Sequence, residues 1–384
     1  MASRKQLPTM VYIPDEVLLN NIFVQLPAKM VAQMRCVSKP WNAFLSQPSF
    51  IKSHLDHSIC NNDEVVIVFY SPFSLNFKPF TAHPCRFPCD EVTSSIKVPV
   101  NTRPKHAYCY VIGSVNGLIC FVGVPQVVHI WNPTLSAMLS LPPSNSTWTV
   151  DCHNLFRFGF DPKTDDYKVV KITGRHGTQH ILTSIDDIYE AKEWLQVEVF
   201  SMRKSCWKVI TQKFPSQVKR IYYENEVSLD GRDGHLHWIG CLDESKPKTI
   251  VAFDLSVETF NEISLPDSIQ GYNEMRSLVV GFRAGKLCAV SHLRYTTACD
   301  VWVMNEYGVA KSWVKHTLSL KCGFKSPIGF TLNNEFLFVA SDESLALYDP
   351  SHPTNAKSFQ VSPIVFKKTK IVQFVDSLVW VATW

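Results

Sequence analysis

The 384-residue sequence contains no apolar run that approaches the ~18 residues needed for a membrane-spanning helix. Its first ten residues, MASRKQLPTM, include no apolar stretch of the kind found in a secretory signal. Its twelve cysteines are too scattered to indicate a disulfide scaffold. These absences predict an intracellular protein of the cytoplasm or the nucleus, without a membrane partner.

The sequence also contains no block of like charge, with 38 basic and 34 acidic residues and a formal net charge of +4. A chain so balanced is not expected to bind nucleic acid or an anionic membrane. No phosphate loop, dinucleotide-binding motif, Gly-x-Ser-x-Gly elbow or His-Glu-x-x-His motif is present. We therefore expect no catalytic residues and no cofactor.

Three clusters of polar residues resemble catalytic or metal sites, but we interpret them as structural. Asp165 and Asp166 are adjacent carboxylates, which face different ways when they lie at the entry to a hairpin. His235 and His237 would share one face of a strand, yet no second pair of metal ligands accompanies them. The last cluster holds too few ligands for a closed zinc site: His83, Cys85 and Cys89. No metal site is predicted.

The start of the sequence indicates a set of short helices with sharp ends. Pro14 suits the first turn of a helix, and the apolar residues that follow recur at helical spacing: Leu18, Leu19, Ile22, Phe23 and Leu26. Pro27 disfavours the helical conformation at the residue before it, so a second helix is expected to begin there. Ser38 is the expected N-cap of a third helix, and Pro48 marks another break. Helices this short are marginal alone, so they must pack on each other and on a partner.

The stretch from Ile13 to Phe50 resembles the F-box, through the segments IPDEVLLNNIFVQLP, LPAK, RCVSKPWNAFL and QPSF. The resemblance implies docking on a Skp-type adaptor and, through it, on the cullin of a ubiquitin ligase. It assigns the adaptor contacts to eight residues: Pro14, Leu18, Ile22, Leu26, Pro27, Val31, Val37 and Trp41. Residues 30–34 depart from the usual family pattern, most clearly at Gln33. The alternative is that these helices only cap the rest of the protein.

Beyond residue 62 the sequence changes to short apolar runs separated by Gly, Pro, Asn and Asp, which predicts an all-β domain without further helices. The domains are therefore expected at residues 10–56 for the F-box, 57–64 for a linker and 65–384 for the β domain. Strands are expected in eight runs: residues 65–70, 118–122, 168–172, 196–200, 250–253, 287–290, 335–339 and 377–382.

Internal repetition indicates the architecture of the β domain. A strand ending in an aromatic residue beside Asn, Ser or Asp recurs about every fifty residues, at positions that include Ser201, Asp254, Met304 and Asp349. This interval suits a four-stranded blade, so the sequence predicts a β-propeller of about six blades. The last segment, KIVQFVDSLVWVATW, is too short for a blade, and residues 65–70 are expected to complete it. A β-sandwich is the alternative.

The repeated segments are also similar to the motif series of the plant F-box-associated interaction domain, a kelch-like family. The matching segments are NGLICF, WNPTLSAMLSLP, FGFDPKTDDYKVVKI, VEVFSMRKSCWKVI, HLHWIG, IVAFDLSVETFNEISLP, DVWVMNEYGVAKSWVKH and VDSLVW, in order along the chain. Within that family the chain is also similar to the S-locus type, whose members recognise pistil ribonucleases. The resemblance implies a protein substrate for the β domain.

These observations predict a non-catalytic substrate adaptor of a Skp/cullin/F-box (SCF) ubiquitin ligase. Loops that are long relative to the repeat are expected to bind the substrate, with six candidate residues: His176, His180, Asp186, Tyr222, Tyr223 and Glu224. Two alternatives remain open at this point, namely a propeller that binds proteins without engaging a ligase, and a propeller enzyme acting on glycans.

Overall fold

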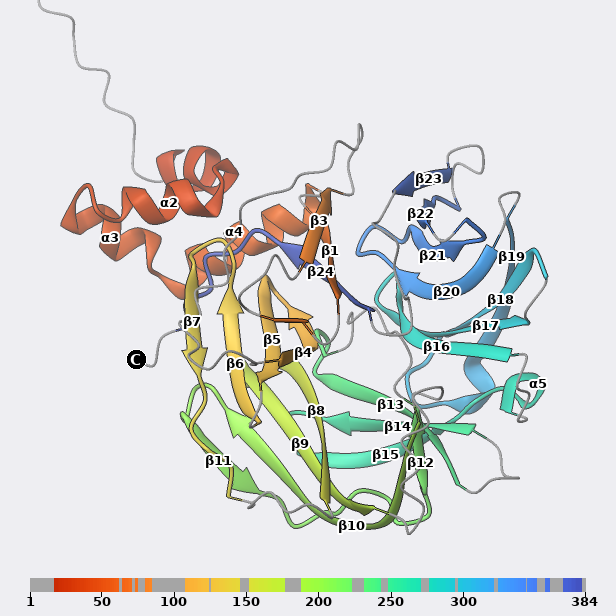
Figure 1. Cartoon of the computed structure of the whole chain (residues 1–384). Coiled ribbons are helices and arrows are strands. Elements are labelled where there is room, and N and C mark those ends of the chain that lie inside the picture. The colour runs from red at the N-terminus through yellow and green to blue at the C-terminus, as the bar shows by residue number, and fades with distance from the viewer. Residues whose placement is uncertain are drawn as a thin grey trace, which may run out of the picture.

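The structure is a computed structural model, and it shows a small helical module beside a much larger β domain (Figure 1). It describes residues 17–61, 64–70, 73–74, 80–84, 108–123, 126–145, 152–176, 188–222, 231–242, 248–270, 276–293, 296–320, 324–342, 344–350, 356–359 and 369–381. The predicted order, helices first and strands afterwards, is confirmed. Within the described residues, no helix has the length and apolar character needed to cross a bilayer.

The helical module, residues 17–61, is built from elements that begin and end where the sequence indicates. A π-helical turn η1 (Leu18–Ile22) and a 3-10 turn η2 (Phe23–Gln25) precede α2 (Ala28–Met34), α3 (Lys39–Leu45) and α4 (Pro48–Cys60). Pro27 is the N-cap of α2, and Leu26 before it is extended, as the restriction that a proline places on the preceding residue predicts. The hydroxyl of Ser38 accepts a hydrogen bond from Trp41 N, 3.3 Å away, which confirms the predicted cap of α3.

Helix α4 continues into the segment that the sequence suggested as a linker. It ends at Cys60, and the first strand starts at Glu64, so residues 57–60 of the expected linker 57–64 are helical. The reason lies in packing, because His54 and Ser58, one helical turn apart, are both buried. The expectation of no later helix is also wrong in detail, since a single turn, α5 (Asp267–Gln270), and a 3-10 turn, η3 (Ala310–Ser312), occur between strands.

The described strands form antiparallel sets. One has the order β24 (Thr369–Val375), β1 (Glu64–Tyr70) and β3 (Phe80–Pro84), and the next contains β2 (Phe73–Ser74), β4 (Tyr108–Val115), β5 (Leu118–Gly123), β6 (Val127–Asn132) and β7 (Ala137–Ser140). The third set contains β8 (Cys152–Asp161), β9 (Asp166–His176), β10 (Ile188–Ser201) and β11 (Cys206–Val209). The fourth contains β12 (Arg220–Tyr222), β13 (His235–Cys241), β14 (Lys248–Asp254) and β15 (Thr259–Ser264). Pairing of β10 with β12 links these two sets. The last two sets are β16 (Arg276–Arg283), β17 (Lys286–Leu293), β18 (Ala298–Met304) and β19 (Trp313–Ser319), then β20 (Phe324–Phe330), β21 (Phe336–Ala340), β22 (Leu345–Tyr348) and β23 (Ala356–Phe359).

The recurrent residue that revealed the repeat stabilises a tight turn. After each of four aromatic residues, a polar side chain accepts a hydrogen bond from a backbone N–H two or three residues later. The residue four positions beyond that side chain has positive φ in all four turns, between 51° and 58°. The polar residues are Asn132, Asp161, Ser201 and Asp254. The repeat is therefore a repeat of turn geometry as well as of strand length.

Successive sets of strands pack face to face. One apolar cluster joins β4–β6 to β8–β10, a second joins β8–β10 to β12–β14, a third joins β13–β15 to β16–β19, and a fourth joins β17–β19 to β20–β22. A set that buries both faces on its neighbours is typical of a propeller, whereas a sandwich contains only two packed sheets.

The two ends of the β domain meet in one sheet. β1 pairs antiparallel with β24 from Glu64 opposite Val375 to Tyr70 opposite Thr369, so the predicted pairing of residues 65–70 with the last segment is present. With β3 they form a set of three described strands, one fewer than the predicted blade. Gln373 Nε2 donates to the Phe330 carbonyl of β20 (2.9 Å), and the backbone carbonyl of Gln373 accepts from Ser114 Oγ of β4 (2.6 Å). The prediction of a strand over residues 377–382 is wrong, because residues 376–381 leave the sheet and run to the helical module.

Candidate interaction surfaces

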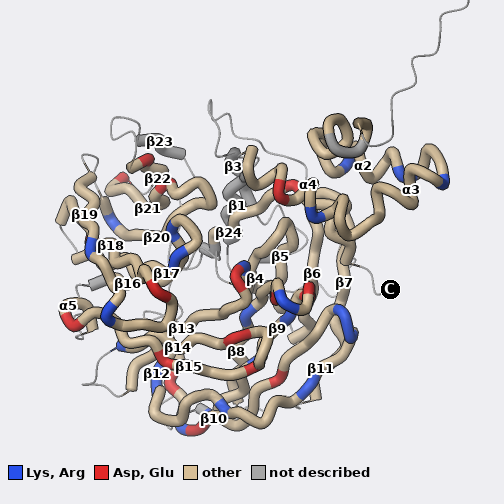
Figure 2. The backbone as a smooth tube through the Cα atoms, turned by 180° about the vertical axis from the view of Figure 1, so that it is seen from behind, with Lys and Arg blue, Asp and Glu red and all other residues tan. Residues whose placement is uncertain are grey.

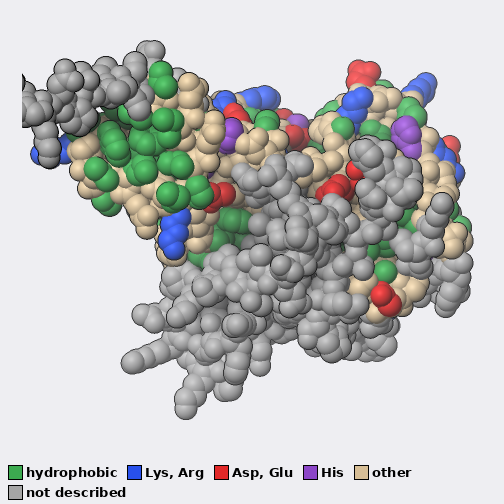
Figure 3. Space-filling view, turned by 90° about the horizontal axis from the view of Figure 1, so that it is seen from above, with side chains coloured by type: hydrophobic (Ala, Val, Ile, Leu, Met, Phe, Trp, Pro, Cys, Tyr) green, Lys and Arg blue, Asp and Glu red, His purple; other side chains and the backbone are tan. Residues whose placement is uncertain are grey.

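The helical module exposes several large apolar side chains on its outer surface (Figure 3). Val37 is 67% exposed in the turn between α2 and α3, and Met30 is 45% exposed on α2. Val17 and Ile22 are 40% and 39% exposed. Apolar side chains gathered on one small module, against the usual tendency to bury them, mark a surface that a partner covers. We call these four residues the apolar surface of the module.

The structure divides the eight predicted adaptor contacts into groups. Ile22, Pro27 and Val37 are exposed, whereas Leu18, Leu26 and Trp41 are half-buried within the module. Pro14 lies outside the described residues.

Val31 is completely buried, and this overturns its assignment as a surface contact. Ala28 and Val31, three residues apart on α2, both face the interior, which turns Met30 outward. The spacing from Ala28 to Val31 was the sequence signal for this orientation. Val17 and Met30 are apolar surface residues that the sequence analysis did not select.

A shared apolar cluster holds the module together and joins it to the β domain. Phe23 and Trp41 meet edge to face with ring centroids 5.1 Å apart, and Arg35 donates to the Leu45 carbonyl at 2.6 Å, which links α2 to α3. Leu135, from the turn between β6 and β7, and Leu378, after β24, belong to the same cluster. The helices are thus packed on the β domain as well as on each other.

A second candidate surface lies where three turns of the β domain meet. The turns are residues 231–234 before β13, residues 284–285 between β16 and β17, and residues 331–334 between β20 and β21. They surround a pocket of about 320 Å³, which we call the mouth pocket, lined by Arg232, Asp233, Phe282, Ala284, Gly285, Thr331, Leu332 and Asn334. Ala284 N donates to Asn334 Oδ1 at 2.5 Å, so two of the turns hold each other in place. Its mixture of apolar and polar walls suits a protein side chain or turn.

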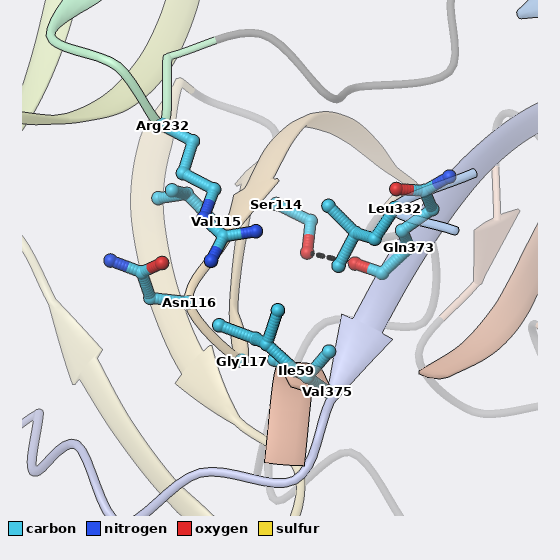
Figure 4. A pocket seen from close by; sticks show the side chains of 9 residues that line it. All are labelled: Ile59, Ser114, Val115, Asn116, Gly117, Arg232, Leu332, Gln373 and Val375. Carbon is cyan, nitrogen blue, oxygen red and sulfur yellow. Dashed lines mark hydrogen bonds between the residues drawn. The ribbon is translucent and has the colours of Figure 1, made fainter. Parts of the chain in front are cut away.

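A smaller cavity of about 20 Å³, the inner cavity, shares two lining residues with the mouth pocket (Figure 4). Arg232 and Leu332 line both spaces, and the inner one is otherwise bounded by residues of β4, the β4–β5 turn, β24 and Ile59 of α4. In Figure 4 the Arg232 guanidinium points into the inner cavity from the side opposite Leu332. A cavity this small has room for about one water molecule, so the mouth pocket is the larger opening for a partner.

Comparison with known proteins identifies the family of this chain. Residues 59–354 match the family described as the F-box associated beta propeller domain. The chain belongs to this family.

The chain is 28% identical to the F-box protein CPR1 of Arabidopsis thaliana, over 80% of this chain and 72% of that protein. It is 26% identical to the Arabidopsis F-box/kelch-repeat protein At3g23880, over 78% of this chain and 77% of that protein. A solved structure titled "YCF48 bound to D1 peptide" aligns with a TM-score of 0.33 at 12% identity, over 72% of this chain and 76% of that chain. The protein is a plant F-box protein, and we refer to its helical module as the F-box.

Within the F-box associated domain, only one of the predicted substrate-binding residues can be located as a side chain. Tyr222 is 6% exposed, packs in the cluster between β12–β15 and β16–β19, and lies under the ammonium of Lys248, 4.5 Å from the ring centroid. Its burial makes it a core residue, so its assignment to the substrate surface is wrong. His180, Asp186, Tyr223 and Glu224 lie outside the described residues, as does the side chain of His176.

The two long segments chosen as substrate loops, residues 174–192 and 222–233, are described only at their ends. Residues 177–187 follow β9, whereas residues 223–230 end at Gly231, whose carbonyl accepts from Phe160 N (2.6 Å) beside the β8–β9 turn. Strand β9 runs from that turn to His176 over 11 residues, on the order of 30 Å. The first segment returns at Ile188, which pairs with Tyr222 where the second segment begins. Among the described residues of the two segments, only Arg232 and Asp233 of the second line the mouth pocket.

The histidines of β13 lie beside the mouth pocket and take part in strand packing. His237 is 3% exposed and its Nε2 lies 2.8 Å from Tyr307 Oη, while the centroids of the His235 and Tyr307 rings lie 4.5 Å apart with the rings tilted by 40°. His235 Nδ1 lies 3.4 Å from Asp233 Oδ2. No group of three or more potential metal ligands occurs among the residues described, and Cys85 and Cys89 lie outside them.

The adjacent carboxylates of the β8–β9 hairpin have separate structural positions. Asp165 is exposed with φ 52°, whereas Asp166 is buried and accepts hydrogen bonds from Ser201 Oγ (2.5 Å) and Arg203 N (2.8 Å). This is the hairpin position that the sequence analysis assigned to them. Elsewhere on the domain, acidic and basic residues are interspersed along the described backbone (Figure 2).

A buried histidine makes the stability of the F-box depend on pH. His54 is 1% exposed, and its Nε2 lies 2.8 Å from the Leu26 carbonyl, so the neutral ring donates there. Burial lowers the pKa of His54 below its ordinary value of 6.5, and the nearby charge of Asp376 offsets this only in part. Below pH 6.5 the unfolded chain takes up a proton at His54 that the folded chain does not. The free energy of unfolding is therefore undiminished by His54 above pH 6.5 and falls as the pH drops below it.

We expect the His54→Gln variant to lose part of this pH dependence, because a glutamine amide can donate to the same carbonyl without titrating. The measurement is urea unfolding at pH 7.5 and pH 5.5, monitored through the hydrogen exchange of backbone amides in η2 and α4. His129 and His292, whose pKa values are also lowered by burial, remain and keep the rest of the dependence. An unchanged pH slope for amides of the F-box would contradict the assignment.

Proposed function

We propose that the protein is the substrate-recognition subunit of an SCF-type E3 ubiquitin ligase. Its F-box docks on a Skp-type adaptor through the apolar surface of the module, and the adaptor connects it to a cullin. The observation that carries this proposal is the exposure of Ile22, Met30 and Val37 on a module whose interior is already filled. Single exposed apolar residues also occur on the β domain, as at Val257, so the support comes from several of them on one small module of a plant F-box protein.

The β domain is proposed to be a closed propeller of six blades that holds a protein substrate. The face-to-face packing of successive sets supports this, as do the bonds from Gln373 to β20 and to β4. The substrate would bind at the mouth pocket and the turns around it. The chain itself would carry out no chemistry, and would act by holding the substrate near the ubiquitin-charged enzyme in the cytoplasm or nucleus. A pistil ribonuclease is one candidate substrate, supported by the S-locus resemblance.

The test of adaptor docking is reconstitution from purified components. The full chain, a panel of plant Skp-type adaptors and a cullin are mixed and separated by size-exclusion chromatography. We expect a complex of one copy of each component. If the folded chain elutes free from every adaptor in the panel, the ligase proposal is wrong and a ligase-independent binding protein takes its place.

The substrate surface is tested by a photo-crosslinking side chain at Tyr307, which is 41% exposed beside the mouth pocket. Val209 on β11, 45% exposed, provides the matched control position away from the mouth. In plant cells with the proteasome blocked, we expect crosslinked proteins from position 307 that are absent from position 209. Equal crosslinking at both positions, or crosslinking at 209 alone, would move the substrate surface away from the mouth.

A further inference from the structure

The last described residues of the chain lie between the F-box and the β domain. After β24 ends at Val375, residues 376–381 continue without strand pairing and alternate in what they contact. Leu378 is fully buried in the cluster of the F-box, whereas Val381, 1% exposed, is buried in the cluster between β4–β6 and β8–β10. One short segment thus contributes to two cores.

Two contacts attach this segment to the F-box. Asp376 Oδ2 accepts a hydrogen bond from Ala28 N at the start of α2, at 2.5 Å. A carboxylate at this position satisfies a backbone donor that α2 leaves open and lies at the positive end of the helix dipole. Leu378 packs beside Phe23 and Val31, which are themselves buried. The segment therefore completes the inner face of the F-box.

The β6–β7 turn, in the sequence motif WNPTL, attaches the same segment to the β domain. Asn132 is fully buried and donates from Nδ2 to the carbonyls of Ser377 (3.0 Å) and Val379 (2.8 Å). Thr134 Oγ1 donates to Asp376 Oδ1 at 2.7 Å, so one carboxylate bridges the turn and α2. Leu135 follows in the same turn and packs on the F-box cluster.

A glycine makes the crossing of the segment possible. Gly117, in the β4–β5 turn, has φ +78°, and a Cβ at this position would overlap the Cβ of Ser377 and lie 2.6 Å from the Val375 carbonyl. A side chain at this position would therefore displace the segment where it leaves the sheet. Residues of the motifs NGLICF and WNPTL thus both act on the segment 376–381.

We propose that residues 376–381 form a strut that fixes the orientation of the F-box relative to the β domain. In the sequence, a short connection joins α4, which ends at Cys60, to β1, which starts at Glu64, and domains joined by one short linker usually move against each other. The strut adds a second connection through Asp376 and Leu378. In the ligase complex, on which this consequence rests, a fixed orientation selects which substrate lysines face the ubiquitin-charged enzyme.

The test compares two variants within the strut. In Asp376→Ala/Leu378→Ala, both contacts with the F-box are removed, whereas Val381→Ala removes a contact with the β domain alone. The first measurement is hydrogen exchange at the Ala28 amide in the full chain, which we expect to accelerate about tenfold in the double variant and to stay unchanged in Val381→Ala. Small-angle X-ray scattering should show a broader distribution of interatomic distances within the molecule for the double variant than for the wild type.

The second measurement is ubiquitin transfer in the reconstituted ligase, read as the set of the chain's own lysines that become modified. We expect the double variant to bind the adaptor within about twofold of the wild type, because Asp376 and Leu378 lie away from the apolar surface of the module. Its modified lysines should spread over more positions than in the wild type. Unchanged exchange and scattering in a folded double variant would overturn the strut. Loss of adaptor binding by the wild type would instead overturn the ligase proposal and leave the exchange result standing.

If the double variant fails to fold, Thr134→Val gives a milder form of the test. It removes only the hydroxyl that donates to Asp376, and it leaves Leu378 in place. Exchange at the Ala28 amide should then accelerate by about two- to threefold. No change relative to the wild type would count against the bridge through Asp376.

Discussion

Replacement of Val37 by glutamate is expected to weaken adaptor binding by at least about 100-fold, through the cost of burying an unpaired carboxylate in an apolar interface. Val37 is 67% exposed in the turn between α2 and α3, and it is not part of the buried cluster of the F-box. A charge there is therefore solvated in the free protein, and the fold should tolerate it. The affinity is measured by biolayer interferometry with an immobilised Skp-type adaptor.

The matched control is Val257→Glu in the turn between β14 and β15, where the valine is 60% exposed. The two variants make the same chemical change at similar exposure, one on the F-box and one on the β domain. We expect the control to bind the adaptor as the wild type does. Normal binding by a folded Val37→Glu variant would show that the adaptor uses another part of the module. A Leu26→Asp variant would be less informative, because Leu26 packs in the F-box cluster and its carbonyl lies against His54.

The second large effect is expected in the β domain, at a buried ion pair between β9 and β10. Lys171 Nζ lies 3.2 Å from Glu198 Oε2, with side chains 3% and 0% exposed. Burial lowers the pKa of Lys171, and the charge of Glu198 partly offsets this. Lys171 also donates to Ser144 Oγ (2.6 Å), and Asn145 N donates to Glu198 Oε1 (2.8 Å), so the pair anchors the segment after β7.

Replacing Lys171 by methionine should lower the free energy of unfolding by about 3–5 kcal/mol, because the buried Glu198 carboxylate loses its cation. The double variant Lys171→Met/Glu198→Met should recover most of this loss, since no isolated charge then remains. Urea unfolding followed by tryptophan fluorescence measures both.

The same two strands provide a control at the surface. Arg175 and Glu193 also form an ion pair at 3.2 Å, but their side chains are 52% and 53% exposed. We expect Arg175→Met to change stability by less than about 1 kcal/mol. An equal effect of Lys171→Met and Arg175→Met would show that burial does not set the strength of the inner pair.

Much of the fold could be predicted because it depends on interactions between residues that are close together in the sequence. The helix ends at Pro27, Ser38 and Pro48 depend on restrictions that act within a few residues, and the structure has its helix starts at these positions. The recurrent residue of the repeat, such as Ser201 or Asp254, is visible for the same reason, since its side chain accepts from the turn that follows it.

The surfaces were harder to predict, because an apolar residue looks the same in a sequence whether it is buried or exposed. Val31 and Met30 are neighbours on α2, yet one is fully buried and the other is 45% exposed. Tyr222 was chosen for its polar surroundings in the sequence, whereas it is buried between two sets of strands. Which side of a helix or strand faces inward depends on what packs against it, and that partner is far away in the chain.

The sequence by itself determined a helical F-box, a repeated all-β domain and the pairing of the two ends of that domain, because spacing, turn residues and repeats are local or periodic. Tertiary structure alone decided where the F-box sits. Residues 376–380 belong to the matching segment VDSLVW, but the segment does not reveal its contacts. The contacts with Ala28 and Asn132 join parts of the chain more than 200 residues apart. Such contacts arise only when the folded domain brings its ends together, so the strut became visible only in the structure.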